Sequence, residues 1–231
     1  MMKSTVDKAE KPVHLFDVDY TVVRKTSAQC FLAEALKEKY ITFSQIRGLP
    51  VDLIKYKLAR PDMDFIEKTV KRLPGIKESD ILHVSEICFE KRIKPNIYKG
   101  AADLITEAQK KGEKVIFASS SFDFILKPLE RYFGIEGSLA SRMEYKDGVT
   151  TGNLYGYSFF GAKKKTAAQE WMANNGISPK DVIFYSDSYT DIPLLEYCGN
   201  PVAVNPDRIL AKKAGKLGWK ILRFYDVIDA N

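Results

Sequence analysis

Residues 13–23 constrain this chain more than any other stretch, because an apolar run of strand length ends there in two carboxylates. Asp17 and Asp19 are two residues apart, and in an extended chain such residues share one face. In open α/β sheets, ligands bind at the carboxyl ends of the strands. Two like charges held so close require a cation or a proton between them. The stretch indicates either a Mg²⁺ site with a carboxylate nucleophile or a strand that runs into an Asp-rich turn.

Strand and helix patterns alternate through most of the remaining chain. After the first strand at 13–18, the pattern predicts strands at 115–118, 182–185, 202–204 and 220–224. Helices are predicted at 100–111, 122–133, 162–175 and 206–217, with a further one after 191 and a hairpin at 143–157 around Asp147-Gly148. This alternation predicts a doubly wound, mostly parallel α/β sheet with helices on both faces.

Residues 24–99 interrupt that alternation with four amphipathic helical segments, at about 27–40, 42–60, 62–73 and 78–94. The second is broken at Gly48-Leu49-Pro50, Pro74-Gly75 stops the third, and Pro95 ends the fourth. In the third, apolar or small residues recur with a 3.6-residue period: Phe65, Ile66, Thr69, Val70 and Leu73. We expect an all-helical cap domain at 24–99, inserted into a core formed by 1–23 and 100–231.

The charge distribution also sets the inserted segment apart. The 231 residues carry a net charge of +6, and 24–99 hold 16 Lys/Arg and 10 Asp/Glu. The remaining residues hold 20 of each sign, so the whole basic surplus lies in the cap segment. That surplus favours an anionic substrate or a nucleic acid, unless it is simply a solvated helical face.

Cysteine usage and hydropathy bear on the compartment. The three cysteines, Cys30, Cys88 and Cys198, fit no metal-binding spacing, and their odd number favours reduced thiols. Residues 1–11 are polar and do not form a signal peptide, and no apolar run reaches the roughly 18 residues of a membrane span. We expect a soluble, cytoplasmic protein with no membrane partner.

Polar groups follow two further strands. Ser119 and Ser120 follow the strand at 115–118, Asp187 and Asp191 follow the strand at 182–185, and three lysines at 163–165 lie near a helix start. In a parallel sheet these strand ends lie at one edge. Taken singly, the serine fits a turn, the aspartates fit helix caps, and the lysines fit a solvated surface. Their order and placement together favour one shared site.

Phosphoryl transfer requires this combination of groups. A carboxylate attacks phosphorus, and Mg²⁺ bound by oxygen ligands neutralises the charge between carboxylates and phosphate. A hydroxyl, backbone N–H groups and a lysine hold the other phosphate oxygens. A second acid protonates the leaving alcohol and then deprotonates the attacking water.

These residues resemble the haloacid dehalogenase superfamily of phosphohydrolases, in the helical-cap branch that includes phosphoserine phosphatase. The first motif is Phe16-Asp17-Val18-Asp19-Tyr20-Thr21, the second is the strand ending in Ser119, and the third is a lysine among 163–165. The fourth is the run from Ser186-Asp187-Ser188 to Asp191-Ile192-Pro193, and the tail Pro201 to Asp207 is also similar. The resemblance covers nearly all of 13–224, although the cap matches only in position and helical character.

The resemblance implies a Rossmann-like core and a role for each matching position. Asp17 is implied as nucleophile and Mg²⁺ ligand, and Asp19 as general acid/base that also offers its backbone carbonyl to the metal. Asp187 is implied as a further metal ligand, with Asp191 in the first or second shell of the metal. Ser119 and the Ser120 N–H are implied to bind phosphate.

The lysine of the third motif is chosen from helix periodicity. The helix should bury the positions four and seven residues after the lysine. From Lys164 these are Ala168 and Trp171, whereas Lys163 and Lys165 each bring in a polar residue, Glu170 and Gln169 respectively. We therefore expect Lys164 to contact the phosphate.

Three departures from the phosphoserine phosphatase pattern bear on the substrate. Where those enzymes carry a glutamate for the substrate ammonium, this chain reads Arg24-Lys25-Thr26-Ser27, which disfavours a cationic amine. Ser120-Ser121 replace two glycines, and Tyr20 replaces a small residue.

The sequence favours a Mg²⁺-dependent phosphatase that hydrolyses a small organic phosphomonoester through an aspartyl phosphate. The alternatives are phosphoserine phosphatase proper and a non-enzymatic protein that binds an anion or nucleic acid, although the cap shows no nucleic-acid motif. A glycosyltransferase would leave Ser119, Lys164 and Asp187 unexplained. The expected partner is a small phosphorylated substrate and not a nucleic acid, and the oligomeric state is open.

Overall fold

A computed structural model describes residues 11–46, 64–156 and 158–228. Its centre is a six-stranded, wholly parallel sheet with strand order β3-β2-β1-β6-β7-β8. The strands are β1 (Val13–Phe16), β2 (Lys114–Phe122), β3 (Ser138–Ser141), β6 (Val182–Ser186), β7 (Asn200–Val204) and β8 (Lys220–Leu222). Because β1 lies between β2 and β6, the carboxyl ends of these three strands are neighbours at one edge of the sheet.

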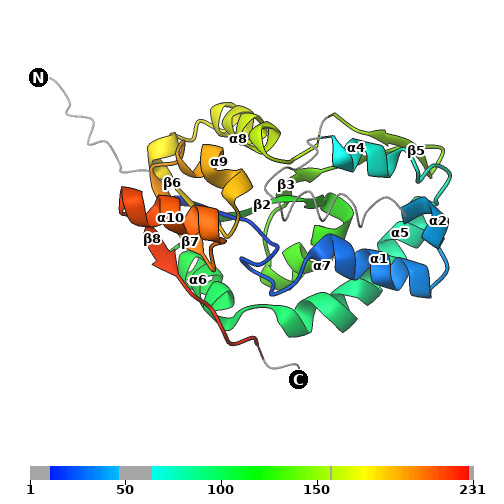
Figure 1. Cartoon of the computed structure of the whole chain (residues 1–231), viewed down its shortest axis with the longest axis horizontal. Helices are drawn as coiled ribbons and strands as arrows, with labels where there is room; N and C mark the ends of the chain where they lie inside the picture. Colours follow the sequence, from blue (N-terminus) through cyan, green and yellow to red (C-terminus); the bar gives the residue numbers. More distant parts are fainter. Residues whose placement is uncertain (1–10, 47–63, 157, 229–231) are drawn as a thin grey trace, which may run out of the picture.

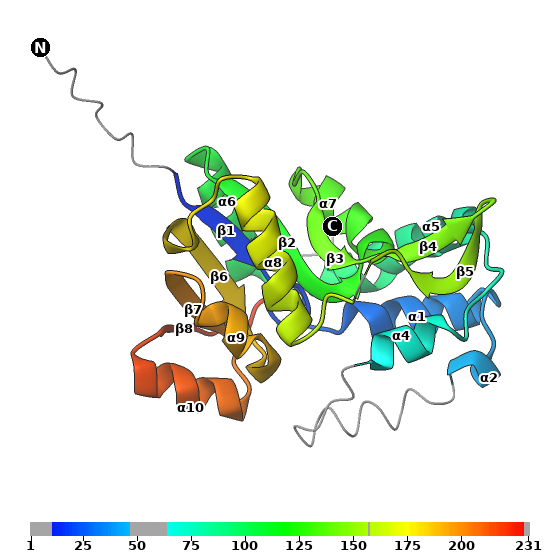
Figure 2. The ribbon, with the colours of Figure 1, turned by 90° about the horizontal axis from the view of Figure 1, so that it is seen from above.

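Alternation along β1 shows how the sheet separates two cores. Leu15 packs with the layer that contains α8 (Ala162–Asn174), α9 (Ile192–Leu195) and α10 (Arg208–Leu217). Phe16 points to the opposite layer, which contains α6 (Lys99–Lys110) and α7 (Asp123–Phe133). Figure 2 shows α8, α9 and α10 on one side of the sheet and α6 on the other. The predicted doubly wound α/β fold is confirmed.

The cap segment forms a helical group beside the sheet. It contains α1 (Ser27–Lys37), α2 (Phe43–Ile46), α4 (Phe65–Val70) and α5 (Glu78–Cys88), and Figure 1 shows them together at the end of the molecule away from β6, β7 and β8. The chain continues from α5 through the π-helical turn η1 (Phe89–Ile93) and the 3₁₀ turn η2 (Lys94–Asn96). The predicted break at Gly48-Leu49-Pro50 and most of the helix expected at 42–60 lie outside the described residues.

A two-stranded hairpin, β4 (Met143–Lys146) and β5 (Val149–Leu154), joins the cap although it belongs to the core part of the sequence. Thr150 N–H donates to the Ile76 carbonyl at 2.9 Å, and Gly75 N–H donates back to the Thr150 carbonyl at 2.8 Å. The cap side of the molecule is therefore not built from helices alone. The hairpin itself was predicted, but its position against the cap was not.

The two ends of the cap segment meet where the chain enters and leaves it. Val23 and Ile97 form an antiparallel bridge, and Tyr98 N–H donates to the Val22 carbonyl at 2.9 Å. This pairing is compatible with the predicted boundaries at residues 23–24 and 99–100, which stay a prediction.

The largest differences from the predicted strands are at β2 and β3. β2 continues to Phe122 rather than stopping at Ala118, with a register irregularity against β3 between Ala118 and Phe122. β3 itself was missed, because Ser138–Ser141 lies at the sheet edge and has no apolar run to signal a strand.

Candidate active site

The first carboxylate of the site continues the strand that precedes it. Asp17 follows β1 directly, and its N–H donates to the Tyr185 carbonyl of β6 at 2.9 Å, so the parallel ladder holds it in place. Its side chain is buried, at 5% exposure. The chain then reverses: the N–H groups of Val22 and Val23 both donate to the Val18 carbonyl at 2.9 Å.

Asp19 lies inside that reversal. Tyr20 adopts a positive φ of 56°, which a non-glycine residue rarely takes up and which marks a sharply turned loop. Asp19 Oδ1 accepts a hydrogen bond of 2.8 Å from the Ser27 N–H at the start of α1. The carboxylate is thus tied to the first residue of the first cap helix.

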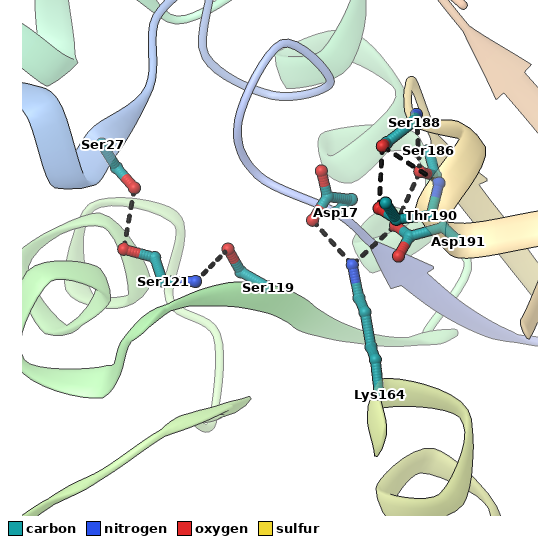
Figure 3. A network of polar contacts seen from close by, with 9 residues as sticks. All are labelled: Asp17, Ser27, Ser119, Ser121, Lys164, Ser186, Ser188, Thr190 and Asp191. Carbon is teal, nitrogen blue, oxygen red and sulfur yellow. Dashed lines mark hydrogen bonds and ion pairs between the residues drawn. The ribbon is translucent and has the colours of Figure 1, made fainter. Parts of the chain in front are cut away.

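Lys164 is the central cation of the site. It is 2% exposed, and its Nζ donates to Asp17 Oδ1 at 2.8 Å and to Asp191 Oδ2 at 2.7 Å (Figure 3). Ser186 Oγ donates to the same Asp191 oxygen at 2.7 Å. Helix α8 begins after Gly161, whose φ of 56° suits glycine, and this turn aims the first helical turn at the strand ends.

The two neighbouring lysines lie elsewhere. Lys163 Nζ donates to Glu67 Oε1 on α4 at 2.9 Å, and Lys165 Nζ lies 5.5 Å from the centre of the Tyr197 ring. Among the three lysines, the structure places Lys164 against Asp17. The helix buries Ala168 as expected, whereas Trp171 is only partly buried.

Three hydrogen-bonded serines, Ser27, Ser119 and Ser121, lie on the side of Asp17 away from Asp191 (Figure 3). Ser119 is fully buried at the end of the paired part of β2, and its Oγ accepts the Ser121 N–H at 3.2 Å. Ser121 Oγ in turn accepts from Ser27 Oγ at 2.9 Å, which links the core strand to α1. Ser120, between them, is partly exposed. No role was predicted for Ser27, Ser121 or Ser186, although Ser186 opens the fourth motif and Ser121 follows Ser120.

The loop after β6 is held from a neighbouring strand. The Asp207 N–H donates to the Asp187 carbonyl at 2.9 Å, and Asp207 Oδ2 accepts the Tyr189 N–H at 2.6 Å. Asp207 Oδ1 also caps α10 through the N–H groups of Ile209 and Leu210. The bonds fix the loop carrying Asp187 and Asp191 to the end of β7, and this role of Asp207 was not predicted.

The carboxylates carry more negative charge than Lys164 balances. Burial, with the lowering effect of Lys164 against it and the charges of Asp191 and Asp19 in support, raises the pKa of Asp17 to about 7. Burial, followed by the charges of Asp17 and Asp191, raises the pKa of Asp187 well above its usual value. Burial also raises the pKa of Asp19, with the Ser27 hydrogen bonds opposing the shift. A divalent cation would relieve this repulsion.

The oxygen ligands at the strand ends suit Mg²⁺ better than a metal ion that takes all of its ligands from protein side chains. No three His, Cys, Asp or Glu side chains in the described part of the chain are grouped closely enough to hold an ion by themselves. Mg²⁺ characteristically uses one or two carboxylates and completes its shell with water and substrate phosphate. The Asp17 and Asp187 carboxylates with the Asp19 carbonyl would supply such a set, so the residues fit the ion.

A family model described as haloacid dehalogenase-like hydrolase matches residues 14–196, which include every predicted site residue. The chain belongs to this family. The recognised resemblance is therefore confirmed, as is the prediction that the chain is a hydrolase of this kind. Between residues 11 and 228, the described helices include none long and apolar enough to cross a membrane.

Two curated relatives of this family member carry phosphatase names. A probable phosphatase of Mycobacterium tuberculosis is 30% identical over 90% of this chain and 74% of its own length. The histidinol-phosphatase of Neisseria meningitidis is 28% identical over 93% of this chain and 99% of its own length. These names agree with the prediction of a phosphoric monoester hydrolase.

Solved structures reproduce the fold. A protein of unknown function from Bordetella pertussis superposes with a TM-score of 0.80 at 26% identity, covering 92% of this chain and 99% of that one. A phosphoserine phosphatase solved as an analogue of its phospho-aspartyl intermediate superposes with a TM-score of 0.68 at 21% identity, covering 94% and 95%. At that identity the likeness to phosphoserine phosphatase concerns the fold alone.

Proposed function

We propose that the protein is a Mg²⁺-dependent phosphatase that hydrolyses a phosphomonoester of a small organic molecule through an aspartyl phosphate on Asp17. The observation that carries the proposal is the buried bridge from Asp17 through Lys164 to Asp191 at the carboxyl ends of β1 and β6. A carboxylate held against a fixed cation, in a family of hydrolases, suits attack on an anionic phosphoryl group.

In the proposed reaction, an Asp17 carboxylate oxygen forms a bond to phosphorus while the bond from phosphorus to the leaving oxygen breaks. Asp19 gives its proton to that oxygen, so the alcohol leaves neutral. Asp19 then takes a proton from a water molecule, which attacks phosphorus and releases inorganic phosphate from Asp17. The raised pKa of Asp19 favours the protonated form that the first step needs.

Binding of the phosphoryl group is assigned to Ser119, Ser120 and Lys164. In Figure 3 the Ser119 hydroxyl lies on one side of Asp17 and the Lys164 ammonium lies on the other, and Ser120 is the next residue after Ser119. When bound by Asp17, Asp187 and the Asp19 carbonyl, Mg²⁺ would neutralise charge on the transferring phosphoryl oxygens. Asp191 is proposed to hold Lys164 in place and to reach the metal directly or through water.

The cap, residues 24–99, is proposed to cover the site, exclude water and select the substrate. Polar contacts near the site that link cap and core include Ser27 to Ser121 and Glu67 to Lys163. The cytoplasmic location stays a prediction; the three cysteines are buried and free, which agrees with a reducing compartment.

Phosphate release with Mg²⁺ or with a chelator tests the proposal. The wild-type protein should release phosphate from p-nitrophenyl phosphate with Mg²⁺ and lose this activity with the chelator. Asp17→Asn should abolish turnover while circular dichroism stays unchanged, whereas Asp103→Asn, on the exposed face of α6, should keep it. Release by Asp17→Asn near the wild-type rate would reject Asp17 as nucleophile.

A further inference from the structure

A cavity of about 100 Å³ lies between the cap helices and the core segments that follow Ser121. Most of its lining residues are apolar, although Thr69 and Asp80 are among them, and they come mainly from α1, α4, α5 and α7, with Phe122 at the end of β2 and Met143 at the start of β4. The walls include Ala28, Phe31, Ile81, Phe122, Phe124 and Met143. A preformed apolar cavity bordering a catalytic centre is a natural place for an apolar part of a ligand.

The cavity adjoins the acid that the proposed reaction places at the leaving oxygen. The Ser27 N–H holds Asp19 Oδ1 at 2.8 Å, and the next residue, Ala28, is a wall of the cavity. Consecutive Cα atoms are only about 3.8 Å apart, so the cavity begins within one residue of the Asp19 contact.

A second connection repeats this arrangement from the core. Ser121 Oγ accepts from Ser27 Oγ at 2.9 Å, and the residue after Ser121, Phe122, is also a wall of the cavity. The Ser27–Ser121 pair thus stands between the serines assigned to the phosphoryl group and the apolar space. Two chain segments therefore lead from the Ser27–Ser121 pair, which contacts Asp19 and Ser119, to the wall of the cavity.

We propose that the substrate is a phosphomonoester whose alcohol carries a compact apolar group, and that this group occupies the cap cavity; this inference rests on the proposed phosphatase function. Asp19 must reach the leaving oxygen to protonate it, and Asp19 is held by Ser27. The carbon attached to that oxygen therefore lies near Ser27, and the rest of the alcohol extends from there into the cavity. By the same volume measure, a cavity of about 150 Å³ accepts benzene, so about 100 Å³ accommodates roughly four carbon atoms.

The same cavity disfavours a charged leaving group. An ammonium in an apolar space loses its hydration without a partner to replace it. Asp80 on α5 is among the lining residues, but the chain that enters the cap before Ser27 is basic: Arg24 donates to Asn96 Oδ1 at 3.3 Å, and Lys25 is exposed. Phosphoserine should therefore be a poorer substrate than an apolar ester of similar size.

A series of n-alkyl phosphates from methyl to octyl tests the proposal on the full chain with Mg²⁺. Because burial of one methylene corresponds to a factor of about four, kcat/KM should rise about fourfold per carbon up to roughly butyl and then level off or fall. Butyl phosphate should also exceed phosphoserine. A flat or falling series among active substrates, or a preference for phosphoserine, would overturn the inference and leave the phosphatase function standing. Absence of release from every ester, p-nitrophenyl phosphate included, would overturn both.

Filling the cavity gives an independent readout. Ala28→Leu places three extra carbons at the cavity wall and should lower the ratio of butyl to methyl phosphate kcat/KM about tenfold. Ala211→Leu, on α10 across the sheet, is the matched control and should leave the ratio unchanged. An unchanged ratio in a folded Ala28→Leu protein would contradict the proposal, and the alkyl series on the wild type decides the matter if that variant does not fold.

Discussion

Buried or partly buried carboxylates in the core and in the cap are balanced in different ways. In the core, Asp17 and Asp191 share the single ammonium of Lys164, and Asp187 and Asp19 lie within their electrostatic reach. In the cap, Glu34 pairs with Arg92, and Glu67 pairs with Lys163 and accepts from Ser158. Burial raises the pKa of Asp17, whereas the pKa values of Glu34 and Glu67 are lowered by their partners although burial opposes this.

This difference in pKa shifts indicates that the carboxylates of the cap and of the core have different roles. The cap acids are compensated within the folded chain, so their charges contribute to stability. Asp17, Asp19 and Asp187 in the core have raised pKa values, so the fold alone does not stabilise their ionised forms. Such an excess of charge is characteristic of functional sites, where a ligand or metal completes the balance.

The largest effect is expected at Lys164. Lys164→Met leaves Asp17 and Asp191 buried without their cation, and we expect a loss of roughly 3–5 kcal/mol in unfolding free energy and of roughly 10³-fold in kcat. Urea unfolding in the presence of a chelator and steady-state phosphate release measure these two effects. Lys165→Met is the matched control, since Lys165 faces the Tyr197 ring, and its two values should stay close to wild type. A fully active Lys164→Met protein would contradict the role of Lys164 as the cation that serves Asp17 and the phosphoryl group.

A smaller loss, without loss of catalysis, is expected in the cap. Arg92→Met leaves Glu34 at 2% exposure without its charged hydrogen-bond donor, which should cost about 2 kcal/mol in urea unfolding. The kcat should stay within about twofold of wild type, because the pair does not touch the strand ends. Arg131→Met breaks an exposed pair with Glu86 and should change stability by less than about 0.5 kcal/mol. Equal losses in both variants would contradict the contrast between buried and exposed pairs.

The pH dependence of the metal-free protein should follow the core acids. Because the pKa of Asp17 rises from 3.8 when unfolded to about 7 when folded, the folded state binds more protons between these values. Stability in a chelator should therefore fall as pH rises from 5 to 7, by at most about 1.4 kcal/mol per pH unit for one group. Asp17→Asn should make the profile shallower, with the remaining slope due to Asp19 and Asp187. Glu34 and Glu67 in the cap do not affect stability in this range, because their lowered pKa values mean that they change protonation below about pH 4.5. If stability rose across this range, the claim that the core carboxylates carry uncompensated negative charge would be wrong.

The smallest effect is expected where cap and core meet. Glu67→Gln keeps an oxygen for the Ser158 hydroxyl but removes the charge that Lys163 contacts, and the side chains of Glu67 and Lys163 are 26% and 38% exposed. We expect a loss below about 1 kcal/mol in urea unfolding, largest at low salt. Glu90→Gln, in an exposed pair with Lys94, is the control and should change less. A loss of several kcal/mol would mean that the cap is held to the core mainly by this pair.

Sequence patterns predicted the core better than the cap. The strands before Asp17, Ser119 and Asp187 could be predicted because buried parallel strands have short apolar runs in their sequences. Their parallel arrangement places the ends of these strands together. Helix periodicity also singled out Lys164, which the structure places at Asp17.

What the sequence did not predict depends on contacts between distant segments. The hairpin around Thr150 packs on the cap through backbone bonds at Gly75 and Ile76, which leave no side-chain pattern. Ser27 and Ser121 become neighbours only when α1 meets the end of β2, and Asp207 holds the Asp187 loop from another strand. Short polar residues give a periodicity analysis nothing to detect.

The central claim is that Asp17 carries the phosphoryl group. Rapid quenching of the wild-type protein with a ³²P-labelled phosphomonoester and Mg²⁺, followed by peptide mapping, measures this directly. The account predicts an acid-stable, base-labile label on the peptide that contains Asp17, absent from Asp17→Asn and retained by Asp103→Asn. Phosphate release without any label under conditions that trap acyl phosphates, or a label on another residue, would contradict it.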